Sequence, residues 1–294
     1  MKTVLDIGVL IVTLLMMVTV GTELETQHFR ELARRKWTWT RVFVLQATLL
    51  PAIGFALVRW LGLPPHVSAG ILLLAACPVG DIANVYTLLA RGNVAMSVSM
   101  NTLSCLLSLV TMPLIFGAYT RFLNEPFVFA VPPSTLILRL SLMVAVPVVA
   151  GMALRRFKPG WVASHGDMLR RLTFSGIGVL LLYVMVSRRA QLAAEWRTTT
   201  VAASALMALA MGAGLTVGRF LRLSAADIFT TGVVFAVRNV GLAFAVAVTL
   251  LNRLDYAVFA AIYFLVEIPL LLGAATAYSF MSNRVRESRS FEGA

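Results

Sequence analysis

A chain of 294 residues, 59% of them hydrophobic and only 13% charged, carries more apolar surface than one water-soluble core can bury. Runs of about 20 apolar residues recur along it, which is the length that crosses about 30 Å of hydrocarbon. These features exclude a single soluble domain and predict an all-α polytopic membrane protein. The formal net charge of +12 comes from basic residues in scattered loops and forms no continuous stripe, so we expect a lipid bilayer and no nucleic acid as partner.

Apolar runs bounded by charges, Pro and Gly predict about nine transmembrane helices. The first run follows Lys2 without a small-residue cleavage site, so we expect a retained helix and not a removable signal peptide. The predicted spans are residues 3–21, 38–62, 67–90, 93–119, 134–154, 172–188, 198–219, 226–250 and 255–281.

The Lys and Arg residues in the loops, the tail and the ends of these spans divide unequally between the two sides of the membrane. Sixteen fall on the side of the C-terminus and seven on the side of the N-terminus. Basic residues in short loops favour the cytoplasm, so we expect the N-terminus outside and the C-terminus inside. Arg188, Arg189 and Arg197 are an exception, because they fall on the predicted outside.

Two predicted spans are interrupted by polar residues. Residues 77–84 include Asp81 and Asn84, and residues 235–241 include Arg238 and Asn239. Irregular backbone and ionised side chains are tolerated at membrane depth only where they are buried in protein or line a watery cavity. Two such breaks in corresponding halves of a chain predict a transport site.

The two halves of the chain also resemble each other. Residues 110–118 and 266–274 share a pattern of apolar residues with Pro and Gly at an offset of 156, and Asn84 and Asn239 lie 155 residues apart. An odd number of spans separates equivalent elements, which predicts an inverted repeat with two crossed discontinuous helices near the midplane.

Residues 77–98 resemble the most specific signature of the bile acid:sodium symporter-like transporters, CPGG followed by SN and LA-x-G-[DN]-x-ALSV. Gln46, five residues before Pro51, resembles that family's Q-x-x-x-x-P, and Arg238-Asn239 takes the place of its QN pair. The resemblance covers nearly the whole chain, without the first helix of the ten-helix members. It implies core helices in residues 38–119 and 198–281 and panel helices in residues 3–21 and 134–188, all within one transporter domain of residues 1–294.

The resemblance also implies where relatives bind sodium, and this chain departs from that pattern. Asn84 and Ser97 match, whereas Ala83 replaces a Ser and Asn101 replaces a Thr. Asn84, Ser97 and Asn101 are therefore the residual sodium-site candidates.

The second half of the implied sodium site is altered more strongly. The family's Glu position holds Val234, and its Gln position holds Arg238. Sodium prefers oxygen ligands, whereas a guanidinium offers five donors and no acceptor. We therefore expect coupling to protons, or none, in place of sodium.

Three charges lie deep within the predicted spans, namely Asp81, Arg238 and Glu267. Asp6 and Arg139 lie near span ends, where snorkelling makes a structural role sufficient. A lone charge at membrane depth costs at least about 2.5 kcal/mol, so we expect Asp81 to pair with Arg238 and Glu267 to be a second partner. The pair either clamps the crossing, or leaves Arg238 to attract an anion while Asp81 or Glu267 exchanges a proton.

These observations predict a secondary transporter of a small organic anion that works by alternating access in a bacterial cytoplasmic membrane. No cofactor and no confident metal site is expected, and the coupling ion would be sodium or a proton. The oligomeric state is left open. The candidate substrate- or ion-binding residues are Gln46, Asp81, Asn84, Thr87, Ser97, Asn101, Arg238, Asn239 and Glu267.

Several alternatives stay open. A sodium symporter could retain a partial site, and an arsenite-type carrier could use Cys77, although Cys77 and Cys105 are also explained as small buried hydrophobes. A non-transporting membrane sensor would more often carry a soluble domain. The three His residues lie far apart in loops, which is unlike an enzyme centre.

Overall fold

The structure is a computed structural model that describes the backbone of residues 2–23, 35–123 and 133–292. Every regular element in these ranges is helical, as predicted. Six helices are long and apolar enough to cross a membrane: Lys36–Leu61, Val94–Phe122, Ser134–Phe157, Pro159–Ser187, Arg189–Phe220 and Leu254–Ser282. Shorter apolar helices lie over the other predicted spans, so the count of nine spans and the inverted repeat remain predictions.

The first half contains α1 (Lys2–Glu23), α3 (Lys36–Leu61), α4 (Pro65–Ala76), α5 (Ile82–Leu89) and α6 (Val94–Leu123). Gly62 ends α3 in the left-handed conformation, with φ of 56°, and Pro65 starts α4, where a missing N–H is harmless. Cys77 ends α4 in an extended conformation, as expected of a residue that precedes proline.

The middle of the chain contains α7 (Pro133–Leu140), a π-helical turn η1 (Ser141–Ala145), α8 (Val146–Phe157) and α9 (Pro159–Ser187). Residues 159–171 were expected to lie before a span, but α9 begins at Pro159, and Pro is favoured in the first turn of a helix. Arg170 therefore lies on a helix.

The second half contains α10 (Arg189–Phe220), α11 (Ala225–Ala236), α12 (Val240–Ala245), a π-helical turn η2 (Val246–Leu250) and α13 (Leu254–Glu292). The charged residues 189–197, expected in a loop, form the first turns of α10. Ser224 and Asn239 cap α11 and α12 by accepting hydrogen bonds from the backbone N–H groups of Asp227 and Leu242.

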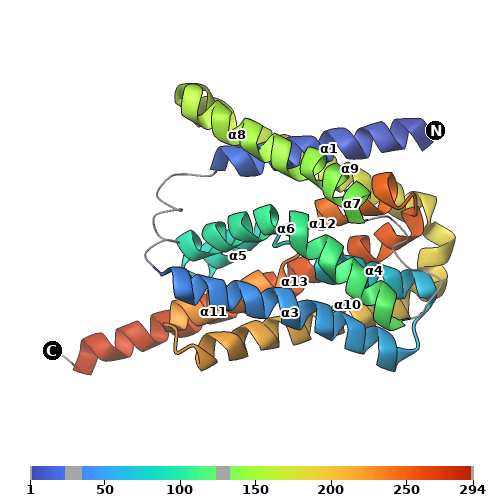
Figure 1. Ribbon diagram of the computed structural model, residues 1–294. Helices are drawn as coiled ribbons and strands as arrows, with labels where there is room; N and C mark the ends of the chain where they lie inside the picture. Colours follow the sequence, from blue (N-terminus) through green and yellow to red (C-terminus); the bar gives the residue numbers. More distant parts are fainter. Residues whose placement is uncertain (1, 24–34, 124–132, 293–294) are drawn as a thin grey trace.

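Helices α1, α8 and α9 pack against one another, and Figure 1 shows them together along one side of the molecule. A Cβ at Gly21 of α1 would lie 2.2 Å from the backbone oxygen of Val148 on α8. Backbones that approach this closely require a small residue at the contact. On the other side, α4 packs against α3 and α13, and α11 packs against α10.

Candidate functional site

The two breaks pair with each other through the backbone. The N–H of Asn239 donates to the carbonyl of Pro78 at 2.9 Å, and the N–H of Gly80 donates to that of Val237 at 3.4 Å. Val79 and Arg238 form an isolated antiparallel bridge. The backbone groups freed by both helix breaks are therefore satisfied across the crossing, as membrane depth demands.

A glycine is required at the point of closest approach. A Cβ at position 80 would lie 2.7 Å from the backbone oxygen of Arg238, which is closer than real Cβ contacts allow. Gly80 thus permits the first break to lie against the second.

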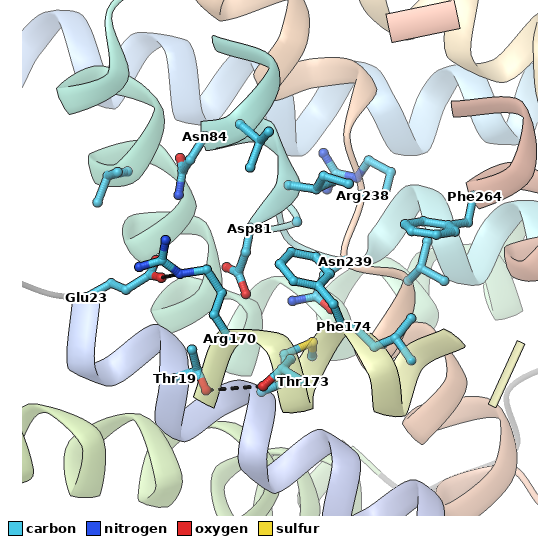
Figure 2. Close-up of a pocket in the computed structure, with 18 of the residues that line it drawn as sticks. Thr19, Glu23, Asp81, Asn84, Arg170, Thr173, Phe174, Arg238, Asn239 and Phe264 are labelled. Atoms are coloured by element: carbon cyan, nitrogen blue, oxygen red, sulfur yellow. Dashed lines mark hydrogen bonds and ion pairs between the residues drawn. The ribbon is translucent and has the colours of Figure 1, made fainter. Parts of the chain in front are cut away.

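The predicted pairing of Asp81 with Arg238 is not found. Asp81 Oδ1 instead accepts a hydrogen bond at 2.5 Å from Asn101 Nδ2 on α6, because Asp81 stands at the start of α5, beside α6. Arg238 is only 6% exposed, and its Nη2 donates to the carbonyl of Cys77. Figure 2 shows the two side chains directed different ways.

Arg238 and Glu267 are under-satisfied in the described structure. Nε and Nη1 of Arg238 and both carboxylate oxygens of Glu267 lack hydrogen-bond partners there, and Glu267 is fully buried. The charges of Glu267 and Arg238 act on each other. Glu267 as the second partner of Arg238 therefore remains a prediction.

The remaining predicted residues make separate contacts. Ser97 Oγ donates to Asn84 Oδ1 at 2.7 Å, which links α6 to α5. Gln46 Nε2 donates to the carbonyl of Val234 at 2.9 Å, so Gln46 joins α3 to α11. The hydroxyl of Thr87 is buried and lacks a hydrogen-bond partner within the described residues.

A cavity of about 250 Å³ lies beside the crossing, and we call it the central cavity. Of the predicted residues, Asp81, Asn84, Arg238 and Asn239 line it, whereas Gln46, Thr87, Ser97, Asn101 and Glu267 are not among its lining residues. Its walls come from α1, α5, α6, α9, α12, α13 and both breaks. The lining residues are Met16, Thr19, Glu23, Gly80, Asp81, Ile82, Asn84, Val85, Leu88, Val94, Val98, Arg170, Thr173, Phe174, Ile177, Arg238, Asn239, Val240, Gly241 and Phe264.

Four polar residues of this cavity were not predicted. Arg170 Nε lies 3.2 Å from Glu23 Oε1, and the hydroxyls of Thr19 and Thr173 are 3.2 Å apart; Figure 2 shows both contacts joining α1 to α9. The sequence placed Glu23 and Arg170 outside the spans. Pro159 was the available signal, because proline is favoured at the start of a helix. A helix that begins there includes Arg170.

Two further cavities flank the central one. A small cavity of about 20 Å³ is lined by residues that include Gln46, Cys77, Ser104 and Arg238. A larger one of about 340 Å³, which we call the charged vestibule, shares three residues with the central cavity. It is lined by Thr19, Thr22, Glu23, Arg155, Pro159, Val162, Ala163, Gly166, Asp167 and Arg170.

Among the described residues, no group of three His, Cys, Asp or Glu side chains is arranged to hold a metal ion. His66 pairs with Glu195 at 2.5 Å, and His165 stacks on Trp161. His28 lies outside the described residues.

Comparison of the sequence with known proteins identifies its family. A model of the Sodium Bile acid symporter family matches residues 10–196, which is more than half of the chain. The chain belongs to the sodium bile acid symporter family. It is therefore a multi-pass membrane protein of a transporter family.

Relatives of this chain occur in bacteria, plants and mammals. The uncharacterized sodium-dependent transporter YocS of Bacillus subtilis is 30% identical over 178 residues, which are 60% of this chain and 54% of the relative. The ileal sodium/bile acid cotransporter of Oryctolagus cuniculus is 31% identical over 186 residues, 63% of this chain and 52% of the relative.

A plant relative matches over a shorter stretch. The probable chloroplastic sodium/metabolite cotransporter BASS1 of Oryza sativa is 34% identical over 138 residues, 47% of this chain and 33% of the relative. The chain thus spans about half or less of the length of these three relatives. The family match ends before the second break, so Arg238, Asn239 and Glu267 lie beyond it.

Proposed function

We propose that this chain is a secondary transporter that moves a small organic anion by alternating access across a bacterial cytoplasmic membrane. In this proposal the N-terminus is outside and the C-terminus is cytoplasmic. Helices α1, α7, α8 and α9 form the panel, and the remaining helices form the core around the crossing. Relatives named as bile acid cotransporters and as a sodium-dependent organic anion transporter support the substrate class.

The observation that carries the proposal is the hydrogen-bonded crossing of the two breaks at the wall of the central cavity. The exposed lining of the cavity is mainly apolar, and its polar groups lie in two places, at the breaks with α5 and on the facing parts of α1 and α9. Such a combination suits a ligand with an apolar body and a charged end. Arg238 contributes a buried positive charge at that wall.

Coupling to sodium is the weaker expectation for this chain. Arg238 brings a fixed cation to the crossing, and its guanidinium supplies no ligand oxygen to a metal ion. Val234 is fully buried and supplies only its carbonyl, which already accepts from Gln46. We therefore propose that transport is coupled to protons, with Glu267 or Asp81 as the exchanging carboxyl, or is uncoupled.

A sodium symporter with a partial site is the second candidate, because relatives are named as sodium-dependent. The candidate oxygens lie in two hydrogen-bonded pairs, Ser97 with Asn84 and Asn101 with Asp81, each of which joins α6 to the region of α5. An arsenite-type carrier is less favoured, since Cys77 lines the small cavity and not the central one.

Uptake into proteoliposomes tests the proposal. The full chain would be assayed with labelled benzoate, octanoate and cholate, each with and without a sodium gradient or an outside-acid pH gradient. We expect saturable uptake of at least one of these anions, at a rate that does not change with the sodium gradient. Absence of uptake for all three would contradict anion transport, and stimulation by sodium alone would favour the second candidate.

The Arg238→Gln variant separates the roles of the guanidinium in the same assay. Loss of anion uptake is expected, because the buried positive charge is removed while a side chain that can hydrogen bond remains. Wild-type uptake by this variant would exclude Arg238 from anion attraction. Arg121→Gln is the control, since Arg121 lies in the exposed last turn of α6 and lines none of the three cavities.

A further inference from the structure

The ion pair of Glu23 and Arg170 stands between the two largest cavities described above. Both residues line the central cavity and the charged vestibule, and Thr19 is the third shared residue. The pair closes at 3.2 Å between the end of α1 and the middle of α9. A side chain that moves at this place therefore alters the lining of both cavities at once.

The pair is accessible and weak enough to open. The side chain of Arg170 is 52% exposed and that of Glu23 is 30% exposed, and ion pairs of this kind contribute at most about 1 kcal/mol. By contrast, Arg238 is buried and directs Nη2 at the Cys77 carbonyl. Of the two arginines that line the central cavity, Arg170 is therefore the more exposed.

Glu23 has a second cation beside it. The charge of Arg155 on α8 also acts on the Glu23 carboxylate, and Arg155 Nη1 donates to the backbone oxygen of Thr22 at 2.9 Å. When Arg170 turns to another anion, Glu23 keeps a positive neighbour. The exchange therefore leaves no isolated carboxylate.

We propose that Arg170 is the carboxylate receptor of the central cavity and that Glu23 is its built-in competitor, displaced when a substrate carboxylate binds. The ligand class is an amphipathic monocarboxylate. Its carboxylate pairs with Arg170, and its apolar body lies along Phe174 and Ile177, which follow Arg170 by one and two turns of α9 and line the same cavity. Displacement of Glu23 also alters the lining of the charged vestibule.

This inference rests on the proposed function, and uptake kinetics test it. With labelled octanoate as probe, Arg170→Gln should raise KM by about 10-fold or more, because a charged hydrogen bond is lost. Arg170→Lys should keep part of the affinity. Glu23→Gln should lower KM by up to about fivefold, because the nearer of the two carboxylates beside Arg170 is gone. The other is Asp167, whose Oδ1 lies 3.9 Å from Arg170 Nη1.

The double variant gives the readout that a structural role would not produce. In the Arg170→Gln background, Glu23→Gln should no longer change KM, since there is no guanidinium left to release. Arg171→Gln is the matched control, because Arg171 is exposed on α9 and lines neither cavity. Equal KM values for wild type and Arg170→Gln would overturn the inference while leaving anion transport intact.

If the wild type shows no uptake, binding of octanoate to the purified protein in detergent can still be measured. Octanoate should raise the melting temperature of the purified wild type. The rise should be larger for Glu23→Gln and absent for Arg170→Gln. Equal stabilisation of wild type and Arg170→Gln, or none of the wild type at millimolar octanoate, would overturn the inference. Failure of uptake with binding retained would count against the proposed function alone.

Discussion

At the scale of single residues, Gly80 is a position with little room for change, because it lies where the two breaks meet. Gly80→Ala places a methyl group 2.7 Å from the backbone oxygen of Arg238, so the two breaks must move apart. Overpacking of this kind costs about 1–3 kcal/mol. We expect a lower melting temperature in detergent and loss of uptake.

Gly178→Ala is the matched control for this prediction. A Cβ at Gly178 on α9 meets no atom within 4 Å, and alanine favours the helix. The control should melt at or above the wild-type temperature. A Gly80→Ala chain as stable and as active as Gly178→Ala would contradict the geometry of the crossing.

Glu267 is the second residue whose surroundings make a specific prediction. The groups whose charges act together with it are Arg238 in the second break, Tyr86 on α5 and Tyr263 on its own helix. Glu267→Gln keeps the shape but cannot release a proton. If Glu267 is the coupling carboxyl, the variant should take up anion at a rate that no longer responds to an outside-acid pH gradient.

Glu195→Gln is the control for Glu267, because Glu195 pairs with His66 on the surface side of α4 and α10. Proton-driven uptake should survive in it. A Glu267→Gln variant that still responds to the pH gradient like the wild type would assign coupling to another group.

At the scale of helices, the contact of α1 with α8 depends on Gly21. A Cβ there would lie 2.2 Å from the Val148 oxygen and 2.9 Å from the Gly151 Cα. Gly21→Ala should therefore separate the two helices, lower the melting temperature and alter the nearby Glu23–Arg170 pair. Gly8→Ala on the same helix meets no atom within 4 Å and should be neutral.

Helices whose positions follow from long apolar runs could be predicted from the sequence. Helix ends that depend on a few residues could not. The two breaks were predicted from polar residues, Asp81 with Asn84 and Arg238 with Asn239, and the structure pairs the backbones of the two breaks. The predicted pairing of Asp81 with Arg238 was wrong, because the direction of a side chain at the start of α5 does not follow from residue spacing. Arg170 was missed because a helix starting at Pro159 was not predicted.

At the scale of the whole molecule, the predicted orientation is testable by labelling cysteines from outside intact cells. Cys77 and Cys105 are free and buried, so the wild type should give little background. Trp60→Cys, at the exposed end of α3, should react with a membrane-impermeant thiol reagent. Lys158→Cys, between α8 and α9, should react only after the cells are opened; the reverse pattern would invert the topology.

The two breaks are joined by hydrogen bonds between main-chain groups, and the buried side chain of Arg238 adds a contact from Nη2 to the carbonyl of Cys77. The hydrogen bonds that join residues 78–80 to residues 237–239 use N–H and carbonyl groups that every residue except proline possesses. Substitutions at position 238 should therefore keep these backbone bonds, so that variants such as Arg238→Gln remain folded even where anion uptake is lost. The position can exchange one chemistry for another within an unchanged architecture.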